Sequence, residues 1–304
     1  MGEREGTKIP VIDLRGFQSQ YEKLRGAGKE WGCFRVLNHG ISEVLMGEMK
    51  AVVASLFDLP MEAKKKNEGQ VVEGCGYKEP TKANPLYESW GLDEMGSAQA
   101  VDVFCSQLNA SPHQREIMKT YCKAMHELAM DIADKLSRCM GLSSGMFEDW
   151  ACELWMNKYS FIPESVGSTG VQLHTDMGFL AVLQDDDAVS GLEVMDKSGS
   201  LVPIDPWPGT FLVILGDMAV AWSNGKLGHA KHRVQCKEGR ARSSVGAFLL
   251  SPKKAAIEAP EELVDAEHPR LYAPFTHSDY RKLRSVVKSR TGEALALFRS
   301  ASEM

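Results

Sequence analysis

The sequence predicts a mainly β fold with flanking helices, organised around a jelly-roll-like core. Before about residue 150, apolar residues recur every three or four positions, which is the spacing of amphipathic helices. From Leu154 onward, short apolar runs follow one another closely, and turn residues such as Gly191 and Gly209 separate them. Many short strands with regular turns are typical of sandwiches and barrels. We therefore expect a helix-rich region, residues 1–150, packed on a β core, residues 151–304, in one compact unit.

The helices of the first region can be placed by their caps and apolar stripes. Residues 17–31 are expected to be helical, and Ser42 is a suitable cap for the next helix. The clearest helix begins at Ser111, where Gln114 completes a capping box, and Gly141 is a natural stop. Residues 68–100, rich in Gly, Pro and Asn, are expected to form a loop. A polar segment, residues 278–298, is expected to be the C-terminal helix.

Composition excludes several classes of protein. The 304 residues carry 35 Lys and Arg against 41 Asp and Glu, a net charge of −6, and an acidic chain of this kind is a poor nucleic-acid binder. The longest apolar runs fall far short of the roughly 20 residues that a membrane helix needs. The seven cysteines are scattered without a CxxC pair. They therefore indicate reduced thiols in a cytoplasmic protein rather than a disulfide scaffold or a structural zinc site.

One pattern in the β region has the residue types of a metal site. His174 and Asp176 stand at i and i+2, a spacing that puts two side chains on one face of a strand. His232 follows 56 residues after Asp176 in another strand-like run. Two histidines and one carboxylate form the triad of non-haem Fe(II) oxygenases, which leaves coordination positions open. We therefore expect these three residues to bind a metal ion.

A second pattern suits a carboxylate ligand. Arg242 and Ser244 share a strand face, and a guanidinium beside a hydroxyl can grip a carboxylate by charge-assisted hydrogen bonds. Upstream, Tyr159 offers a phenol two residues after Asn157. A zinc hydrolase would have no evident use for Arg242 and Ser244, which makes that class a weaker alternative.

The remaining titratable residues are expected to have structural roles. His229 lies an odd number of residues from His232, so in a strand it faces away from a metal bound there. His39 is expected to make a structural hydrogen bond, and Asp217 to cap a turn. Residues 185–187, three consecutive aspartates, are expected to form a solvated turn rather than a cation site. Four further histidines are expected at the surface or in packing: His113, His126, His268 and His277.

Eight segments spread over nearly the whole chain carry a family resemblance. They are residues 9–14, 31–40, 174–176, 190–194, 215–217, 222–225, 231–234 and 242–244. In sequence and order they resemble the plant-type 2-oxoglutarate/Fe(II)-dependent dioxygenases. The resemblance implies a distorted double-stranded β-helix, with O₂ as oxidant and ascorbate as an aid. It also implies that Fe(II) binds His174, Asp176 and His232, and that the cosubstrate 2-oxoglutarate binds Arg242 and Ser244 with help from Tyr159.

A narrower set of segments is similar to the subgroup of dioxygenases for auxin oxidation: residues 57–60, 76–77, 83–88, 104–105, 156–159, 166–167, 178–180, 231–236 and 267–272. This similarity implies oxidation of indole-3-acetic acid to 2-oxindole-3-acetic acid. The chain departs from the pattern at Trp155, where relatives carry Arg, at His229-Ala230, where Asn-Val is expected, and at Ser160, where a Pro-rich turn is common. The first two departures lie near the site and could indicate another substrate.

Two alternatives to auxin oxidation remain open. One is hydroxylation, demethylation or cyclisation of another specialised plant metabolite on the same scaffold. The other is a non-catalytic binding module, which an intact triad argues against. For a small aromatic substrate, the expected walls are Tyr77, Phe179 and Phe248, but no group that binds a substrate carboxylate can be identified. We expect a monomer or weak dimer that acts on a small molecule, without a nucleic-acid or membrane partner.

Overall fold

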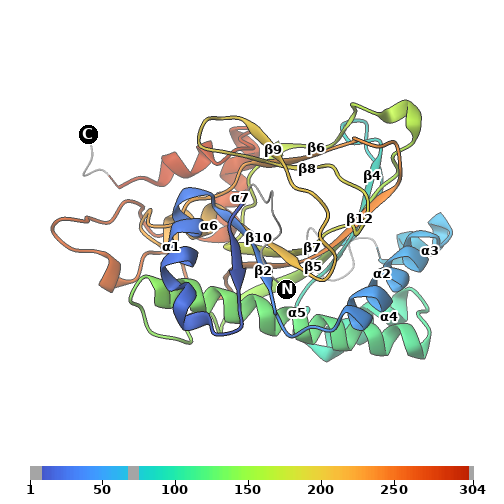
Figure 1. Ribbon diagram of the computed structural model, residues 1–304, viewed down its shortest axis with the longest axis horizontal. Helices are drawn as coiled ribbons and strands as arrows, with labels where there is room; N and C mark the ends of the chain where they lie inside the picture. The colour runs from blue at the N-terminus through green and yellow to red at the C-terminus, as the bar shows by residue number, and fades with distance from the viewer. Residues whose placement is uncertain (1–8, 68–74, 301–304) are drawn as a thin grey trace.

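The structure, a computed structural model, describes residues 9–67 and 75–300 and consists of two β-sheets above a layer of helices (Figure 1). The large sheet has eight strands, in the order β1 (Val11–Asp13), β2 (Cys33–Leu37), β10 (Phe211–Leu215), β7 (Leu180–Gln184), β12 (Arg242–Pro252), β5 (Trp150–Tyr159), β4 (Tyr87–Leu92) and β3 (Gly76–Lys78). The small sheet has four strands, β6 (Thr169–His174), β11 (His232–Gln235), β8 (Leu192–Met195) and β9 (Leu201–Pro203). Only β1 and β2 pair in parallel among these strands. This arrangement confirms the predicted β core with flanking helices.

The helices lie mostly on the outer face of the large sheet (Figure 1). The α-helices are α1 (Tyr21–Glu30), α2 (Glu43–Phe57), α3 (Met61–Lys64), α4 (Ala98–Gln107), α5 (Pro112–Cys139), α6 (Asp217–Trp222) and α7 (His277–Val286). Short 3₁₀ turns complete the chain: η1 (Phe17–Gln20), η2 (Lys65–Asn67), η3 (Pro163–Ser165), η4 (Glu261–Leu263) and η5 (Glu293–Phe298). Within the described residues, none of these helices has both the length and the apolar character that a transmembrane span requires.

Helix α5 forms where its local sequence predicts it. Ser111 accepts a hydrogen bond from the Gln114 backbone while the Gln114 side chain accepts one from the Ser111 backbone, so the capping box is complete. The helix ends at Cys139, and Gly141 follows with φ +84°, a conformation that favours glycine. Its apolar stripe packs against β7 and β12. The stripe is therefore core packing, as expected.

The alternation of side chains along β12 separates the core from a cavity. Val245, Ala247 and Leu249 face the helices and join the larger hydrophobic cluster. Arg242, Ser244 and Phe248 point to the opposite face, toward the small sheet. A second hydrophobic cluster fills part of the space between the two sheets. What remains of that space is the site described below.

Two expectations from sequence need correction. Residues 75–100 are not all loop, since they contain β3, β4 and the start of α4; residues 68–74 lie outside the described part. Strands β3 and β4 form because they pair beside β5, a contact that local composition does not reveal. The C-terminal helix is also interrupted. Helix α7 ends at Val286, and Gly292, with φ +86°, precedes η5.

Candidate active site

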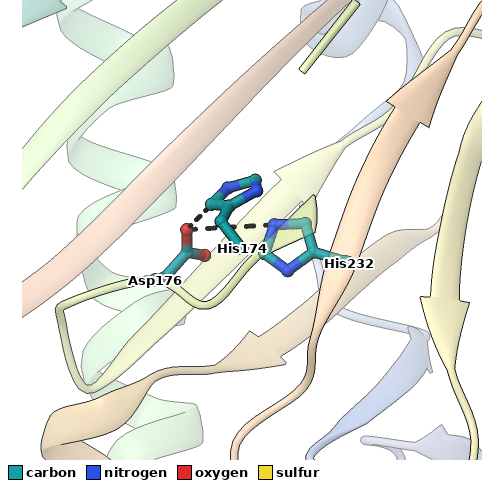
Figure 2. Close-up of side chains that lie close together, drawn as sticks. All are labelled: His174, Asp176 and His232. Atoms are coloured by element: carbon teal, nitrogen blue, oxygen red, sulfur yellow. Dashed lines mark ion pairs between the residues drawn. The ribbon is translucent and has the colours of Figure 1, made fainter. Parts of the chain in front are cut away.

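The three expected metal ligands converge at the edge of the small sheet (Figure 2). His174 ends β6, and His232 begins β11 as its direct register partner. Asp176 lies two residues beyond the end of β6, so a turn rather than strand alternation brings it to the histidines. Its Oδ1 lies 3.6 Å from Nε2 of His174 and 3.8 Å from Nε2 of His232. All three donor atoms lie within 4.8 Å of one another, close enough for one ion to contact them all.

The protonation of both histidines suits metal binding. Nδ1 of His174 lies 2.8 Å from the carbonyl oxygen of Gln172, and Nδ1 of His232 lies 3.1 Å from that of Ala230. A carbonyl only accepts, so each Nδ1 donates its proton there, and Nε2 is the nitrogen of each ring that faces a metal. Burial, together with the nearby His174, lowers the pKa of His232 to about 4 and keeps this ring neutral.

The carboxylate of the triad is ionised. Burial alone would raise the pKa of Asp176, but the opposing influence of His232 and His174 outweighs it and holds that pKa below its usual value. Two imidazoles and one carboxylate, aimed at one point from one side, fit a divalent iron with open positions for other ligands.

A cavity of about 520 Å³ between the two sheets begins at this triad. Arg242, Ser244, Tyr159 and Phe248 all line it, so the structure brings these sequence-predicted residues to the same space as the metal ligands. The volume is in the range of small-molecule sites. The cavity can therefore hold a cosubstrate and a small substrate beside one metal ion.

Arg242 is a buried cation with unused donors. Its guanidinium forms an ion pair with Asp185 and lies 5.0 Å over the ring of Tyr159. Its Nε and Nη1 have no hydrogen-bond partner within residues 9–67 and 75–300. Buried donors without partners cost free energy, so this group is built to receive an acceptor. Ser244 adds a hydroxyl nearby, which accepts a hydrogen bond of 3.3 Å from Asn157. A carboxylate such as that of 2-oxoglutarate fits these donors.

Sequence reasoning missed Asp185 as the partner of Arg242. It was expected in a solvated turn, but it is only 8% exposed and holds the guanidinium of Arg242. Its neighbour Asp186 does serve the turn, because it accepts hydrogen bonds from the backbone of Ala188 and Val189. The signal that could have found Asp185 is its position directly after β7, the strand that pairs with β12.

Two expected substrate walls do not face the cavity. Tyr77 lies on the helix side of β3, where its hydroxyl donates to Glu88 at 2.7 Å and its ring contacts Trp90. Phe179 is fully buried in an aromatic cluster, 4.7 Å from Phe147 between ring centroids. Both expectations are wrong because the position of each ring depends on the strand pairing. Phe248 alone of the three lines the cavity.

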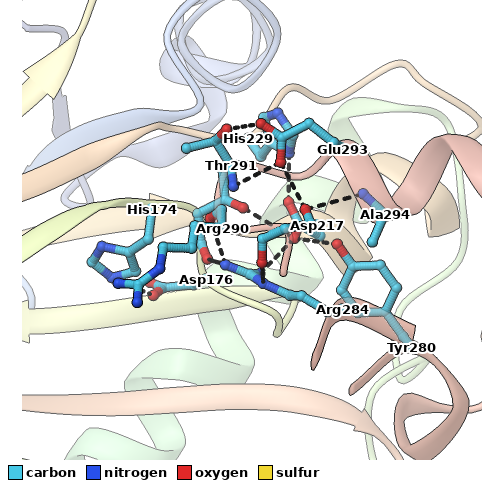
Figure 3. Close-up of polar contacts among 12 residues, drawn as sticks. His174, Asp176, Asp217, His229, Tyr280, Arg284, Arg290, Thr291, Glu293 and Ala294 are labelled. Carbon is cyan, nitrogen blue, oxygen red and sulfur yellow. Dashed lines mark hydrogen bonds and ion pairs between the residues drawn. The ribbon is translucent and has the colours of Figure 1, made fainter. Parts of the chain in front are cut away.

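Asp217 was expected to cap a turn, but it is the centre of a buried polar network behind the triad (Figure 3). Its Oδ2 accepts hydrogen bonds from Thr175 at 3.0 Å, Tyr280 at 2.6 Å and Arg284 at 2.9 Å. Its Oδ1 lies 2.6 Å from Nδ1 of His229. His229 thus faces Asp217 rather than the triad, which agrees with its odd spacing from His232. The network ties α7 to the turn that carries Asp176.

His39 has the structural role expected of it. Its Nε2 lies 3.1 Å from the carbonyl oxygen of Gly209, and its Nδ1 accepts from the backbone of Ile41.

Comparison with known proteins agrees with this geometry. The 2OG-Fe(II) oxygenase superfamily matches residues 151–251, and the family described as non-haem dioxygenase in morphine synthesis N-terminal matches residues 9–94. The 2-oxoglutarate-dependent dioxygenase DAO of Oryza sativa subsp. indica is 50% identical over 95% of this chain and 98% of its own length.

Solved structures show the same fold. The crystal structure of the dioxygenase for auxin oxidation of rice is 48% identical, covers 96% of this chain and 100% of its own, and superposes with a TM-score of 0.90. A 2-oxoglutarate complex of dioxygenase for auxin oxidation 1 from Arabidopsis thaliana is 52% identical over 86% of this chain and 100% of its own, with a TM-score of 0.83. The chain therefore belongs to the 2-oxoglutarate- and Fe(II)-dependent dioxygenases.

Proposed function

We propose that this enzyme oxidises indole-3-acetic acid to 2-oxindole-3-acetic acid. One oxygen atom of O₂ enters the product, and the other enters the succinate formed, with CO₂, from 2-oxoglutarate. The observation that carries the proposal is one cavity whose walls hold both the metal-ligand triad and Arg242. The triad is His174, Asp176 and His232, and Nε and Nη1 of Arg242 have no hydrogen-bond partner among the described residues. The similarity to rice and Arabidopsis enzymes described as dioxygenases for auxin oxidation supports this choice of substrate.

Each residue of the site has a defined part in this reaction. His174, Asp176 and His232 hold Fe(II), which supplies the oxidising chemistry together with 2-oxoglutarate and O₂ when these are bound. Arg242 and Ser244 bind the distal carboxylate of 2-oxoglutarate, and Asp185 keeps the guanidinium in place. Tyr159 packs beneath Arg242 and excludes water from this end of the cavity. The substrate then takes the remaining volume, with Phe248 as one apolar wall.

We infer that the enzyme works in the cytoplasm as a monomer or weak dimer on a free small molecule. All seven cysteines are free thiols, and six of them are buried, which suits a reducing compartment. The net charge of −6 gives no attraction to nucleic acid or to an anionic membrane surface.

The test is coupled turnover of the purified enzyme with Fe(II), ascorbate, 2-oxoglutarate and indole-3-acetic acid. We expect equal amounts of succinate and of a product 16 mass units heavier than the substrate. Succinate formation with another plant metabolite but not with indole-3-acetic acid would instead establish a different oxidation on this scaffold. A lack of iron-dependent succinate with every substrate tried would indicate a non-catalytic binding protein.

A further inference from the structure

The end of the cavity away from Arg242 is lined by basic side chains. Lys78 enters it from β3, while His277 and Arg281 enter it one helical turn apart on α7. These three residues, here called the basic end, come from segments about 200 residues apart in the chain. Sequence reasoning gave none of them a role in the site. Trp155 lines the cavity beside them.

The register of the large sheet fixes where Lys78 lies relative to the 2-oxoglutarate residues. Lys78 pairs with Ser89, Ser89 with Asn157, and Asn157 with Ser244, and all four line the cavity. Three strand spacings therefore separate Lys78 from Ser244, or about 14 Å between backbones. That distance leaves room for a second small molecule next to the one held by Arg242 and Ser244.

The ammonium of Lys78 forms no ion pair among the described residues, although the charge of Glu153 acts on it. Its Nζ lies 4.6 Å from the centroid of the Trp155 ring. A cation–π contact holds an ammonium in place without neutralising it. Burial and the like charge of Arg281 lower the pKa of Lys78, and both side chains line the same cavity.

The other polar groups around Lys78 compensate its positive charge only in part, through Glu153. Nε2 of His277 is buried and has no hydrogen-bond partner among the described residues. The nearby carboxyl is Glu153, which accepts a hydrogen bond of 2.9 Å from Nε1 of Trp155. Burial raises the pKa of Glu153, against the hydrogen bond from Trp155 and the charge of Lys78, which lower it. The basic end thus offers donors and positive charge to an anion.

We propose that the basic end binds the carboxylate of the substrate, and that Trp155 acts as a positioning residue that holds Lys78. The substrate class is then a small aromatic monocarboxylate, with its ring on apolar side chains such as Phe248 and Leu250. The identity of the aromatic ring rests on the proposed function. The binding of a carboxylate at the basic end does not depend on it.

The test compares a carboxylate with its neutral isostere. Indole-3-acetate and indole-3-acetamide are titrated calorimetrically, without O₂, into enzyme loaded with Mn(II) and 2-oxoglutarate. We expect the acid to bind about 10- to 100-fold more tightly than the amide, as charge-assisted hydrogen bonds allow. Lys78→Met and Arg281→Met are expected to lose most of this preference, whereas Lys78→Arg keeps it.

Controls separate this inference from a general loss of structure. Lys82→Met changes an exposed lysine four residues further along, outside the cavity lining, and is expected to bind both ligands as the unaltered enzyme does. The affinity for 2-oxoglutarate is expected to be the same in all variants. Trp155→Phe keeps a ring under the ammonium and is expected to lose less of the preference than Trp155→Leu.

The outcomes distinguish the inference from the proposed function. Equal affinity for acid and amide, or a preference that survives both Lys78→Met and Arg281→Met, would overturn the inference even if indole-3-acetic acid is oxidised. Binding of the acid with the expected preference, but without coupled oxidation, would refute the proposed function and leave the carboxylate site standing. Failure of indole-3-acetate, phenylacetate and benzoate all to bind would refute the carboxylate site itself.

Discussion

Asp217 and Arg284 form a buried ion pair, with 2.9 Å between Oδ2 and Nη1, that joins the C-terminal helix to the metal-binding turn. The backbone N–H of Asp217 donates to the carbonyl of Asp176 at 2.9 Å. Nη2 of Arg284 donates to the carbonyl of Thr175 at 2.6 Å. Both ends of this ion pair therefore hold the turn from which the Asp176 carboxylate reaches the two histidines.

Loss of the Asp217 charge is expected to loosen the metal site and the fold together. Asp217→Asn leaves Arg284 without its buried partner, and breaking such a pair costs about 3–5 kcal/mol of unfolding free energy. Supporting contacts of a metal site are worth about 10- to 100-fold in metal affinity. Urea unfolding and Co(II) titration measure the two effects. Asp131→Asn, which removes an exposed pair with Lys135, is the matched control with little effect on either.

The turn that carries Asp176 packs directly against Gly216. A Cβ added at Gly216 would lie 2.3 Å from the carbonyl oxygen of Gly178 and 2.7 Å from that of Asp176. Because both neighbours are backbone atoms, Gly216→Ala is expected to displace Asp176 and reduce Co(II) affinity at least tenfold. Gly47→Ala, in an exposed part of α2 with open space around it, is expected to stabilise the protein by about 1 kcal/mol without a change in metal affinity. Normal Co(II) binding by Gly216→Ala would refute the role given to this contact.

Arg242 is expected to control affinity for 2-oxoglutarate. Arg242→Lys replaces a planar fork by a single ammonium, so we expect the KM for 2-oxoglutarate to rise tenfold or more while Fe(II) affinity stays nearly constant. Asp185→Asn is expected to act in the same direction, because it removes the partner that orients the guanidinium. Arg240→Lys, at an exposed arginine two residues before Arg242, serves as the control. An unchanged KM in Arg242→Lys would contradict the assignment.

The C-terminal segment is expected to lose stability in acid. Hydrogen bonds from Ser289 and Thr291 lower the pKa of Glu293 from 4.5 to about 2. A group with a lowered pKa stabilises the fold above its unfolded pKa and loses this contribution as pH falls through its folded pKa. Wild-type stability should therefore fall between about pH 4.5 and 2 more steeply than that of Glu293→Gln. Chemical unfolding at each pH gives the comparison, with Glu116→Gln, at an exposed site on α5, as the control.

The parts of the fold that depend on local sequence were predictable. The caps and stripe of α5 and the five-residue strand from Phe211 to Leu215 lie where the pattern places them. Strand β4 was missed because its partner β5 lies more than 60 residues away in the chain, and β3 was missed with it because β3 pairs with β4. A strand whose register is unknown cannot show which way Tyr77 points, so the error in that side chain follows from the error in the strand.

The residues of the site also fall into a group that the sequence predicts and a group that it does not. The triad was predictable because its residue types are rare together and the family resemblance orders them. Asp185, Asp217 and Lys78 could not be recognised, because the sequence around an aspartate or lysine does not show which distant residues it contacts. Arg242 and Arg284, the partners of the two aspartates, lie 57 and 67 residues further on. Burial of a charge is a property of the packed structure.

The most direct test is a crystal structure of the Fe(II)-loaded enzyme with anomalous diffraction measured at the iron edge. A single iron peak is expected about 2.1 Å from Nε2 of His174, Oδ1 of Asp176 and Nε2 of His232. Iron bound instead at Cys75, Asp93 and Glu153, the other group of possible ligands in the described residues, would contradict the assignment of this site. So would an iron centre to which the His232 ring makes no bond.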